Sequence, residues 1–233
     1  MRHAQTLSCP GPGTWRQRLC AWALAHVGTK LEKCVAPYKV RLLTDLSGTV
    51  LEIGPGTGAN LRYLAKEGVR WLGIEPNPYM YPYLEREANL LGMQIDVRQG
   101  TAERLPAPDS SVEAVVSTLV LCCVPDQRRA LQEVLRVLKP GGTFVFIEHV
   151  AAPRGTWLRC LQQWVRPLWR HLGDGCRPDR ETWLAIEQAG FTQLTYEHCT
   201  MPVPIASPHI IGVAVKSPYS VPRARGTPER RWL

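Results

Sequence analysis

The residues best suited to chemistry form one glycine-rich turn, Gly54-Pro55-Gly56-Thr57-Gly58, directly after a short apolar run. Glycine is needed where a backbone turns sharply and a ligand must lie against it without an intervening side chain. In an open α/β sheet, that place is the carboxyl end of the first strand. Nicotinamide-dependent enzymes and phosphate-binding loops share such turns, so the glycines indicate a ligand without identifying it.

Two acidic residues narrow the choice of ligand. Glu52 lies just before the turn, and a carboxylate there would repel a pyrophosphate but attract an ammonium group, directly or through water. The spacing G-x-G-x-G is also tighter than the dinucleotide pattern G-x-G-x-x-G. Glu75 follows Gly54 by 21 residues, where an acid can accept both hydroxyls of a ribose. These features favour an adenosine with a cationic amino-acid tail over a dinucleotide.

A third group of candidates follows the third predicted strand, where Gly100-Thr101-Ala102-Glu103 would hold the edge of the adenine. The predicted cofactor-binding residues are therefore Glu52, Gly54, Gly56, Thr57, Gly58, Glu75, Pro76, Thr101, Ala102, Glu103 and Thr118. The structural alternatives are a tight turn for the glycines and a helix-capping role for Glu75. We favour ligand binding over these structural roles, because the spacing and order of the candidate residues fit a bound ligand at three successive strand ends.

The elements that must position these residues alternate between strands and helices. Strands are predicted at 49–53, 70–75, 94–98, 112–118, 143–149, 194–198 and 210–215, and helices at 15–26, 34–45, 59–67, 79–91, 127–138, 156–172 and 180–189. This alternation predicts a single-domain α/β fold: a Rossmann-like, doubly wound, mostly parallel seven-stranded sheet with helices on both faces. We expect an N-terminal helical cap at 1–47, the ligand-binding domain at 48–216 and a disordered basic tail at 217–233.

Charge is distributed unevenly along the chain. The formal net charge is +8, but residues 1–47 and 216–233 together carry +9, whereas residues 48–215 carry −1. Nucleic-acid enzymes concentrate positive charge on a folded face, so a small-molecule acceptor is favoured and nucleic acid is disfavoured. We expect the basic termini to allow peripheral contact with an anionic membrane surface.

Compartment and membrane topology follow from the cysteines and from hydropathy. The eight cysteines show no C-x-x-C spacing, which favours reduced thiols in an intracellular, cytoplasmic protein. The sequence has no run of 18 apolar residues and no secretory signal, so no membrane-spanning segment is expected.

One predicted helix carries an apolar stripe formed by Trp157, Leu161, Trp164, Leu168 and Leu172. We interpret 156–172 as a helix that covers the core and exposes a basic face. The alternative is a lid over an apolar acceptor that touches a membrane together with Trp15 and Trp22.

Several motifs resemble a known family. LEIGPGTGAN, GIEPNP, AERLPAPDSSVEAVVSTLVLC and LQEVLRVLKPGGTFVFIEHV are similar to the class I S-adenosylmethionine-dependent methyltransferases of type 11. EHVAAPRGTWLR, WRHLGDGC, ETWLAIEQAGF and PHIIGVAVK resemble, more narrowly, a group whose animal members are microsomal thiol S-methyltransferases. The resemblance implies S-adenosyl-L-methionine as cofactor, methyl transfer to a small molecule, and an apolar thiol as acceptor.

The chain departs from this family at two places. The hydrophobic anchor with which the animal members begin has no counterpart, so their membrane location is not transferred. The family's Gly-Asp-Ala is Gly-Thr-Ala here, which leaves the backbone of Ala102, and Glu103, to hold the adenine.

Candidate catalytic residues follow the later strands. A thiol acceptor must be ionised before transfer, and a nearby base would help. His149 ends the fifth strand, Asp174 lies in Gly173-Asp174-Gly175-Cys176, and His209 begins the last strand. Packing is the alternative for both histidines, and a turn cap is the alternative for Asp174. Cys122 and Cys123 are interpreted as small buried apolar residues, and no metal site is predicted.

Other functions stay open from sequence. A C- or O-methyltransferase acting on a quinone-like or phenolic lipid is the second candidate. A non-catalytic cofactor-binding module and a nicotinamide oxidoreductase are alternatives from other classes. Amino-methylating nucleic-acid enzymes are disfavoured because the Asn/Asp-Pro-Pro-aromatic motif does not follow the fourth strand, where Ser117-Thr118-Leu119-Val120 stands.

Overall fold

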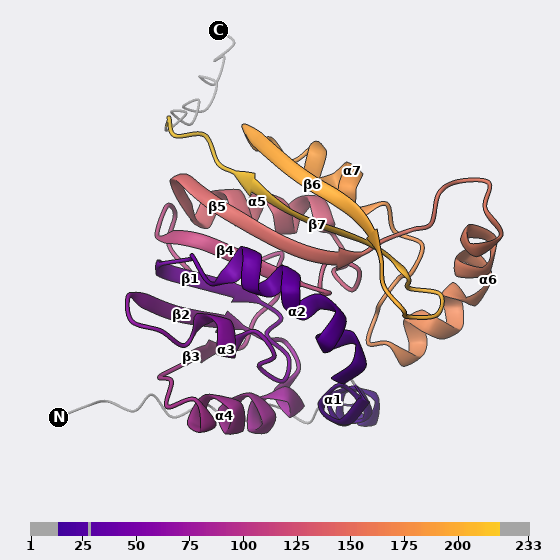
Figure 1. The fold of residues 1–233 in the computed structure, drawn as a ribbon, viewed down its shortest axis with the longest axis horizontal. Coiled ribbons are helices and arrows are strands. Elements are labelled where there is room, and N and C mark those ends of the chain that lie inside the picture. Colours follow the sequence, from indigo (N-terminus) through magenta and orange to yellow (C-terminus); the bar gives the residue numbers. More distant parts are fainter. Residues whose placement is uncertain (1–13, 28, 220–233) are drawn as a thin grey trace, which may run out of the picture.

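A computed structural model describes residues 14–27 and 29–219, and a seven-stranded sheet forms its centre (Figure 1). The strands lie in the order β3-β2-β1-β4-β5-β7-β6, and β7 is antiparallel to both of its neighbours. Their bounds are β1 Gly48–Ile53, β2 Val69–Ile74, β3 Asp96–Arg98, β4 Val112–Thr118, β5 Leu138–His149, β6 Gln193–Thr200 and β7 Pro208–Val215. The doubly wound, mostly parallel seven-stranded sheet predicted from sequence is confirmed.

Helices cover both faces of the sheet, also as predicted. They are α1 Trp15–Val27, α2 Thr29–Leu43, α3 Leu61–Leu64, α4 Tyr81–Leu90, α5 Gln127–Val137, α6 Trp157–Leu172 and α7 Thr182–Glu187, with a 3-10 turn η1 at Pro78–Met80. On one face, α5 and α7 bury Leu131, Val134 and Ile186 against the strands. On the other, α2, α3 and α4 bury Leu43 and Leu84 with their neighbours. Two separate apolar layers therefore hold the strand ends in place.

Element boundaries differ from the sequence prediction mainly around turns. The helix predicted at 59–67 is shorter in the structure, where α3 spans only Leu61–Leu64. It begins later because the amide of Leu61 bonds to the Gly58 carbonyl, and it ends earlier because the backbone leaves helical geometry at Ala65. The strand predicted to begin at residue 143 begins at Leu138 instead, so residues 139–142 lie inside β5. Gly141, at φ +75°, and a register shift between Val112 and Ala114 absorb the irregularity as a β-bulge.

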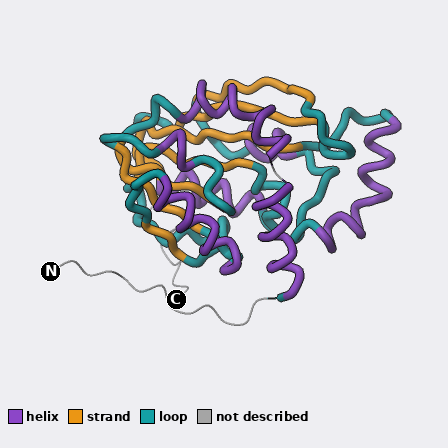
Figure 2. The backbone as a smooth tube through the Cα atoms, turned by 60° about the horizontal axis from the view of Figure 1, so that its bottom comes forward, coloured by secondary structure: helices purple, strands orange, loops and turns teal. Residues whose placement is uncertain are grey.

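Helix α6 lies at one end of the sheet and projects beyond it (Figures 1 and 2). Among the residues of α6 whose burial is described, only Gln162 is fully buried, and its side chain accepts the amide hydrogen of Ala152 at 2.7 Å. Trp157 and Trp164 are 75% and 81% exposed. The prediction that this stripe covers the core is therefore wrong. Periodicity identifies residues that share a helix face, but it does not say which face meets the protein.

In the part of the chain that the structure describes, no helix combines the length and hydropathy needed to cross a bilayer. Residues 1–13 of the predicted N-terminal cap, and residues 220–233 of the predicted tail, lie outside the described residues.

Candidate active site

The glycine turn after β1 has the conformation that its sequence predicts. Gly54, Gly56 and Gly58 have φ values of +60°, +56° and +90°. The amide of Gly54 bonds to the Ile74 carbonyl at 2.8 Å, so the turn begins against the end of β2. A Cβ on Gly54 would lie 2.7 Å from a methyl group of Val120, whereas one on Gly56 would meet nothing within 4 Å. The backbone at Gly56 is thus open to a ligand, while Gly54 is required for packing.

Glu52 lies behind this turn. Its side chain is 2% exposed, and its two oxygens accept hydrogens from Trp71 Nε1 and Asn60 Nδ2, each at 2.8 Å. Asn60 Nδ2 also donates to Thr118 Oγ1 at 3.0 Å. Burial raises the pKa of Glu52, against the opposing effect of the bonds from Trp71 and Asn60. The carboxylate is therefore engaged with protein donors, and it links β1, β2 and β4 beneath the turn.

Glu75 directly follows β2 and faces the turn. Its Oε2 accepts the amide hydrogen of Gly56 at 3.0 Å, and its Oε1 accepts that of Asn77 at 2.8 Å. A carboxylate offers about four acceptor positions, so two are left for the hydroxyls of a ribose. Burial raises the pKa of Glu75 to about 7, against these backbone bonds and with a further contribution from the negative charge of Asp174. The predicted ribose acceptor fits the geometry.

Helix α1 closes over this edge of the sheet. Asn77 Nδ2 donates to the Gln17 carbonyl at 3.0 Å, and the Arg16 guanidinium donates to the His171 carbonyl at 2.5 and 3.0 Å. The helix therefore bridges the loop after β2 and the end of α6. Cys20 on its inner side has a pKa raised to about 11, first by burial and then by the charges of Asp174, Glu75 and Cys176. No site role was predicted from sequence for either residue: Asn77 lies in the GIEPNP motif but was not selected, and Cys20 belongs to no motif.

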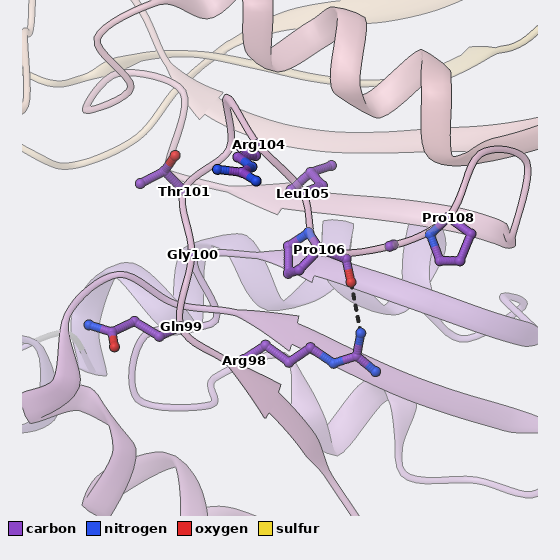
Figure 3. A pocket seen from close by; sticks show the side chains of 9 residues that line it. Arg98, Gln99, Gly100, Thr101, Arg104, Leu105, Pro106 and Pro108 are labelled. Carbon is purple, nitrogen blue, oxygen red and sulfur yellow. Dashed lines mark hydrogen bonds between the residues drawn. The ribbon is translucent and has the colours of Figure 1, made fainter. Parts of the chain in front are cut away.

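The predicted adenine end is built from the loop after β3. Ala102 is buried and Thr101 is exposed, while the Glu103 carboxylate accepts the amide hydrogen of Asp126 at 3.3 Å at the start of α5. An open pocket beside this loop is lined by residues 98–101 and 104–108 (Figure 3). Arg98 spans it and donates to the Pro106 carbonyl at 2.7 Å. The pocket shares Thr101 with the predicted set but includes neither the glycine turn nor Glu75.

The remaining predicted contacts belong to the same loops. Thr57 is half-buried and Pro76 is exposed. Thr118 ends β4, where it accepts the hydrogen bond from Asn60.

The two predicted catalytic histidines are cross-strand neighbours. His149 and His209 are paired in the β5–β7 register, and their ring centroids lie 6.3 Å apart. His209 Nδ1 lies 3.0 Å from the Ser207 carbonyl, an acceptor, so Nδ1 carries the hydrogen and Nε2 is a buried acceptor without a partner. Burial lowers the pKa of His209 to about 4, which keeps the ring neutral at physiological pH.

His149 is engaged with a residue that sequence analysis did not select. Its Nε2 lies 3.0 Å from the sulfur of Cys176. Burial opposes charging of the imidazole, but the bond to Cys176 and the charges of Cys176 and Glu148 outweigh it and raise the pKa of His149. Bonds from the Cys122 and Cys123 thiols, and then His149, lower the pKa of Cys176 despite its burial.

Asp174 lies in the loop after α6. It has a φ of +48°, and burial raises its carboxyl pKa while the charge of Arg16 lowers it. Its charge acts on Glu75 and on Cys20, so the loop after α6 reaches the predicted cofactor edge. Of the three predicted catalytic residues, the two histidines are ring neighbours, whereas the charge of Asp174 acts on Glu75 and Cys20.

Cys122 and Cys123 join Cys176 in a cluster of thiols. Cys122 Sγ lies 3.6 Å from Cys123 Sγ and 3.6 Å from Cys176 Sγ. Cys122 is 1% exposed, as its interpretation as a buried small residue requires, but its sulfur contacts are specific. Sequence gave no signal for this cluster, because Cys176 is far along the chain and the spacing matches no cysteine motif.

The fold and this edge of the sheet define a class I S-adenosylmethionine-dependent methyltransferase: a doubly wound sheet with an antiparallel β7, an open glycine turn after β1, and an acid with free acceptor positions after β2. Residues 51–146 match a family described as a methyltransferase domain. The chain is 42% identical to the thiol S-methyltransferase TMT1B of Homo sapiens over 76% of its own length and 75% of that protein.

A second human relative, the thiol S-methyltransferase TMT1A, is 43% identical over 72% of this chain and 70% of its own. The chain therefore belongs to the S-adenosylmethionine-dependent methyltransferase family that includes these two proteins. Among solved structures, the YcgJ protein of Bacillus subtilis has the same fold, with a TM-score of 0.64 and 21% identity over 79% of this chain and 98% of that one. The protein is an enzyme, and S-adenosyl-L-methionine is its cofactor.

Proposed function

We propose that this methyltransferase acts on a small apolar thiol. The observation that carries the proposal is the 42% identity to TMT1B, which extends over 187 residues and so well beyond the matched domain at 51–146. When bound, S-adenosylmethionine supplies an electrophilic methyl group on a sulfonium. The protein's own contribution is to hold the two reactants in line and to exclude water.

Each predicted cofactor-binding residue has a role in this proposal. The Gly56 backbone provides the bare surface, Glu75 accepts the ribose hydroxyls, and Glu52 acts on the turn through Asn60. Gly54, Thr57, Gly58 and Thr118 shape the same turn, and Pro76, Thr101, Ala102 and Glu103 flank the adenine.

The three predicted catalytic residues act at different points of the proposed site. His209 Nε2 is a neutral, unpartnered acceptor that can orient a thiol S–H. Asp174 places negative charge near Glu75, where it would complement a sulfonium. His149 is a positioning residue that fixes the sulfur of Cys176.

Paired acceptors test the proposal. The full chain is incubated with methyl-labelled cofactor and with aromatic and alkyl molecules that differ only in bearing a thiol or a hydroxyl. We expect label on the thiols and none on the matched alcohols and phenols. Transfer to the phenols or alcohols while the matched thiols stay unlabelled would overturn the choice of a thiol acceptor, and so would cofactor binding without transfer to any of these compounds.

We also propose an intracellular location with peripheral membrane contact. All seven cysteines in the described residues are free, although three of their sulfurs are clustered, which suits a reducing compartment. Trp15 and Trp22 on α1, and Trp157 and Trp164 on α6, are each more than half exposed. Exposed tryptophans flanked by arginines are typical of surfaces that lie at a lipid headgroup layer.

Sedimentation with vesicles tests the membrane contact. The wild type should sediment with vesicles that contain phosphatidylserine and much less with phosphatidylcholine alone. Trp157→Ala combined with Trp164→Ala should reduce binding, while Leu90→Ala, at a 73% exposed position on α4, should not. Equal binding by both variants would rule out the tryptophan surface.

A further inference from the structure

The sulfurs of Cys122, Cys123 and Cys176 all lie within 4.8 Å of one another. Two of the three separations are 3.6 Å. A tetrahedral zinc ion bound to sulfur at about 2.3 Å separates its thiolate ligands by roughly 3.8 Å. The three sulfurs are therefore already spaced as ligands of one ion, and no other group of three metal-ligating residues in the described chain is gathered in this way.

Two irregular loops bring these sulfurs together. Successive side chains usually diverge, but the turn closed by the Cys123 amide and the Val120 carbonyl at 2.8 Å directs both sulfurs to one side. Leu119, at φ +60°, precedes this turn, and Gly175, at φ +91°, precedes Cys176 in the other loop. A non-glycine residue at positive φ is strained, and such strain often occurs at functional sites.

Buried polar groups fix the first of these loops. Glu148 accepts the amide hydrogens of Val120 and Leu121 at 3.2 and 3.1 Å and the Ser117 hydroxyl hydrogen at 2.6 Å. On the other side, Arg180 donates to the Leu121 carbonyl at 3.0 Å. The turn is therefore fixed before any ligand binds, and a guanidinium lies close enough to offset negative charge on the sulfurs.

Cys176 has the surroundings of a thiolate. The Trp169 indole N–H, which is only a donor, points at its sulfur at 3.3 Å, and His149 Nε2 lies 3.0 Å away. Metal-bound thiolates are commonly surrounded by outer-shell donors of this kind. His149 is too close to Cys176 for both to be ligands of a single ion without movement, so we place it outside the ligand set.

We propose that Cys122, Cys123 and Cys176 bind one soft metal ion, best matched by Zn²⁺, through three thiolates. Thiol protons are released on binding, and the ion ties the turn after β4 to the loop after α6. Three protein ligands leave the fourth coordination position of the ion for water or a reacting molecule, which is the arrangement of catalytic zinc sites. This inference does not depend on the identity of the methyl acceptor.

Metal titration of the full chain tests the site. The protein is stripped with a chelator under a phosphine reductant and is then titrated with Zn²⁺ against a chromogenic competitor, and separately with Co²⁺. We expect one equivalent of each ion. The Co²⁺ form should show sulfur-to-cobalt charge-transfer absorption of three-thiolate intensity, with the d–d bands of tetrahedral cobalt.

Single substitutions identify the ligands. Cys123→Ser and Cys176→Ser should abolish tight binding, and His149→Gln should weaken it by about 10- to 100-fold. Cys160→Ser, at an exposed free cysteine on α6, should bind as the wild type does. Cys123 is only partly buried, so its variant is informative even where a fully buried one fails to fold. The proposal is overturned if the reduced wild type binds neither ion, or if Cys123→Ser keeps wild-type affinity and charge-transfer intensity.

Discussion

The carboxylate of Glu75 accepts the amide hydrogen of Gly56 at 3.0 Å, and this bond joins the acid after β2 to the bare turn after β1. The turn and the acid follow β1 and β2, which are adjacent parallel strands with Ile53 opposite Ile74. The turn and the acid are therefore held together before the cofactor binds, and the ribose would contact both at once. Such preorganisation lowers the ordering cost of binding.

Replacing Glu75 by Gln tests this arrangement. The amide keeps the volume but removes the charge and one acceptor oxygen, so bonds to the backbone amides and ribose hydroxyls weaken. Hydrogen bonds to a charged group contribute about 1.5–3 kcal/mol, so affinity for S-adenosylhomocysteine should fall by about ten- to a hundredfold. Isothermal titration calorimetry measures the affinity for S-adenosylhomocysteine. Glu67→Gln, on an exposed turn, is the control, and unchanged affinity in Glu75→Gln would exclude the ribose role.

The pH dependence of cofactor affinity should follow Glu75. Its pKa is raised to about 7, first by burial, and the groups that face it are Asp174, Glu52, Cys20 and Tyr81. Below pH 7 the protonated acid loses acceptor capacity, so affinity should fall by up to about tenfold per pH unit.

Stability of the cofactor-free protein should change in the opposite direction. A raised acid pKa stabilises the fold fully below the unfolded value of 4.5 and loses that contribution as pH rises through about 7. Calorimetric titration and chemical denaturation from pH 5.5 to 8 measure the two trends. A flat affinity profile in the wild type, or the same slope in Glu75→Gln, would contradict this assignment.

Gly56→Ala should separate ligand contact from backbone strain. An alanine at φ +56° costs about 1–2 kcal/mol, and its methyl group would project into the space left for the ligand. Gly68→Ala is a matched control, because Gly68 has a φ of +81° and also has nothing near its Cβ position, but lies at the other end of the sheet. Both variants should lose similar stability in denaturation, and Gly56→Ala alone should lose cofactor affinity. Equal affinity in the two would show that no ligand lies on Gly56.

The fold was predictable because its signals are local. Strand β4 spans the predicted residues 112–118, since an apolar run bounded by turn residues leaves little choice. The orientation of α6 was not predictable, because Trp157 and Gln162 lie on the same helix and only the tertiary contacts decide that the glutamine faces inward.

The site was predictable where a backbone conformation requires a residue type. The positive φ of Gly56 and the strand-end position of Glu75 are encoded in one motif and one spacing. Cys122 contacts Cys176, which lies 54 residues away in the sequence, and Asn77 contacts Gln17, which lies 60 residues away. Contacts of this kind depend on topology, and local sequence carries no signal for them.

Glu52 provides the last test, because both of its partners are donors. Trp71 Nε1 and Asn60 Nδ2 each point at one carboxylate oxygen in a fully buried site. Glutamine in place of Glu52 has a single acceptor oxygen, so one donor loses its partner and an amide N–H₂ faces it. An unsatisfied buried polar group costs about 1–3 kcal/mol.

The melting temperature of Glu52→Gln should fall by roughly 2–4 °C per kcal/mol for a domain of this size. Asn60→Ala should behave similarly, since it removes the donor to Glu52 and Thr118, while Asn89→Ala on the exposed side of α4 should be neutral. Thermal denaturation without cofactor measures all three variants. If Glu52→Gln melts as the wild type does and loses only cofactor affinity, the carboxylate contacts the ligand and does not act through Asn60.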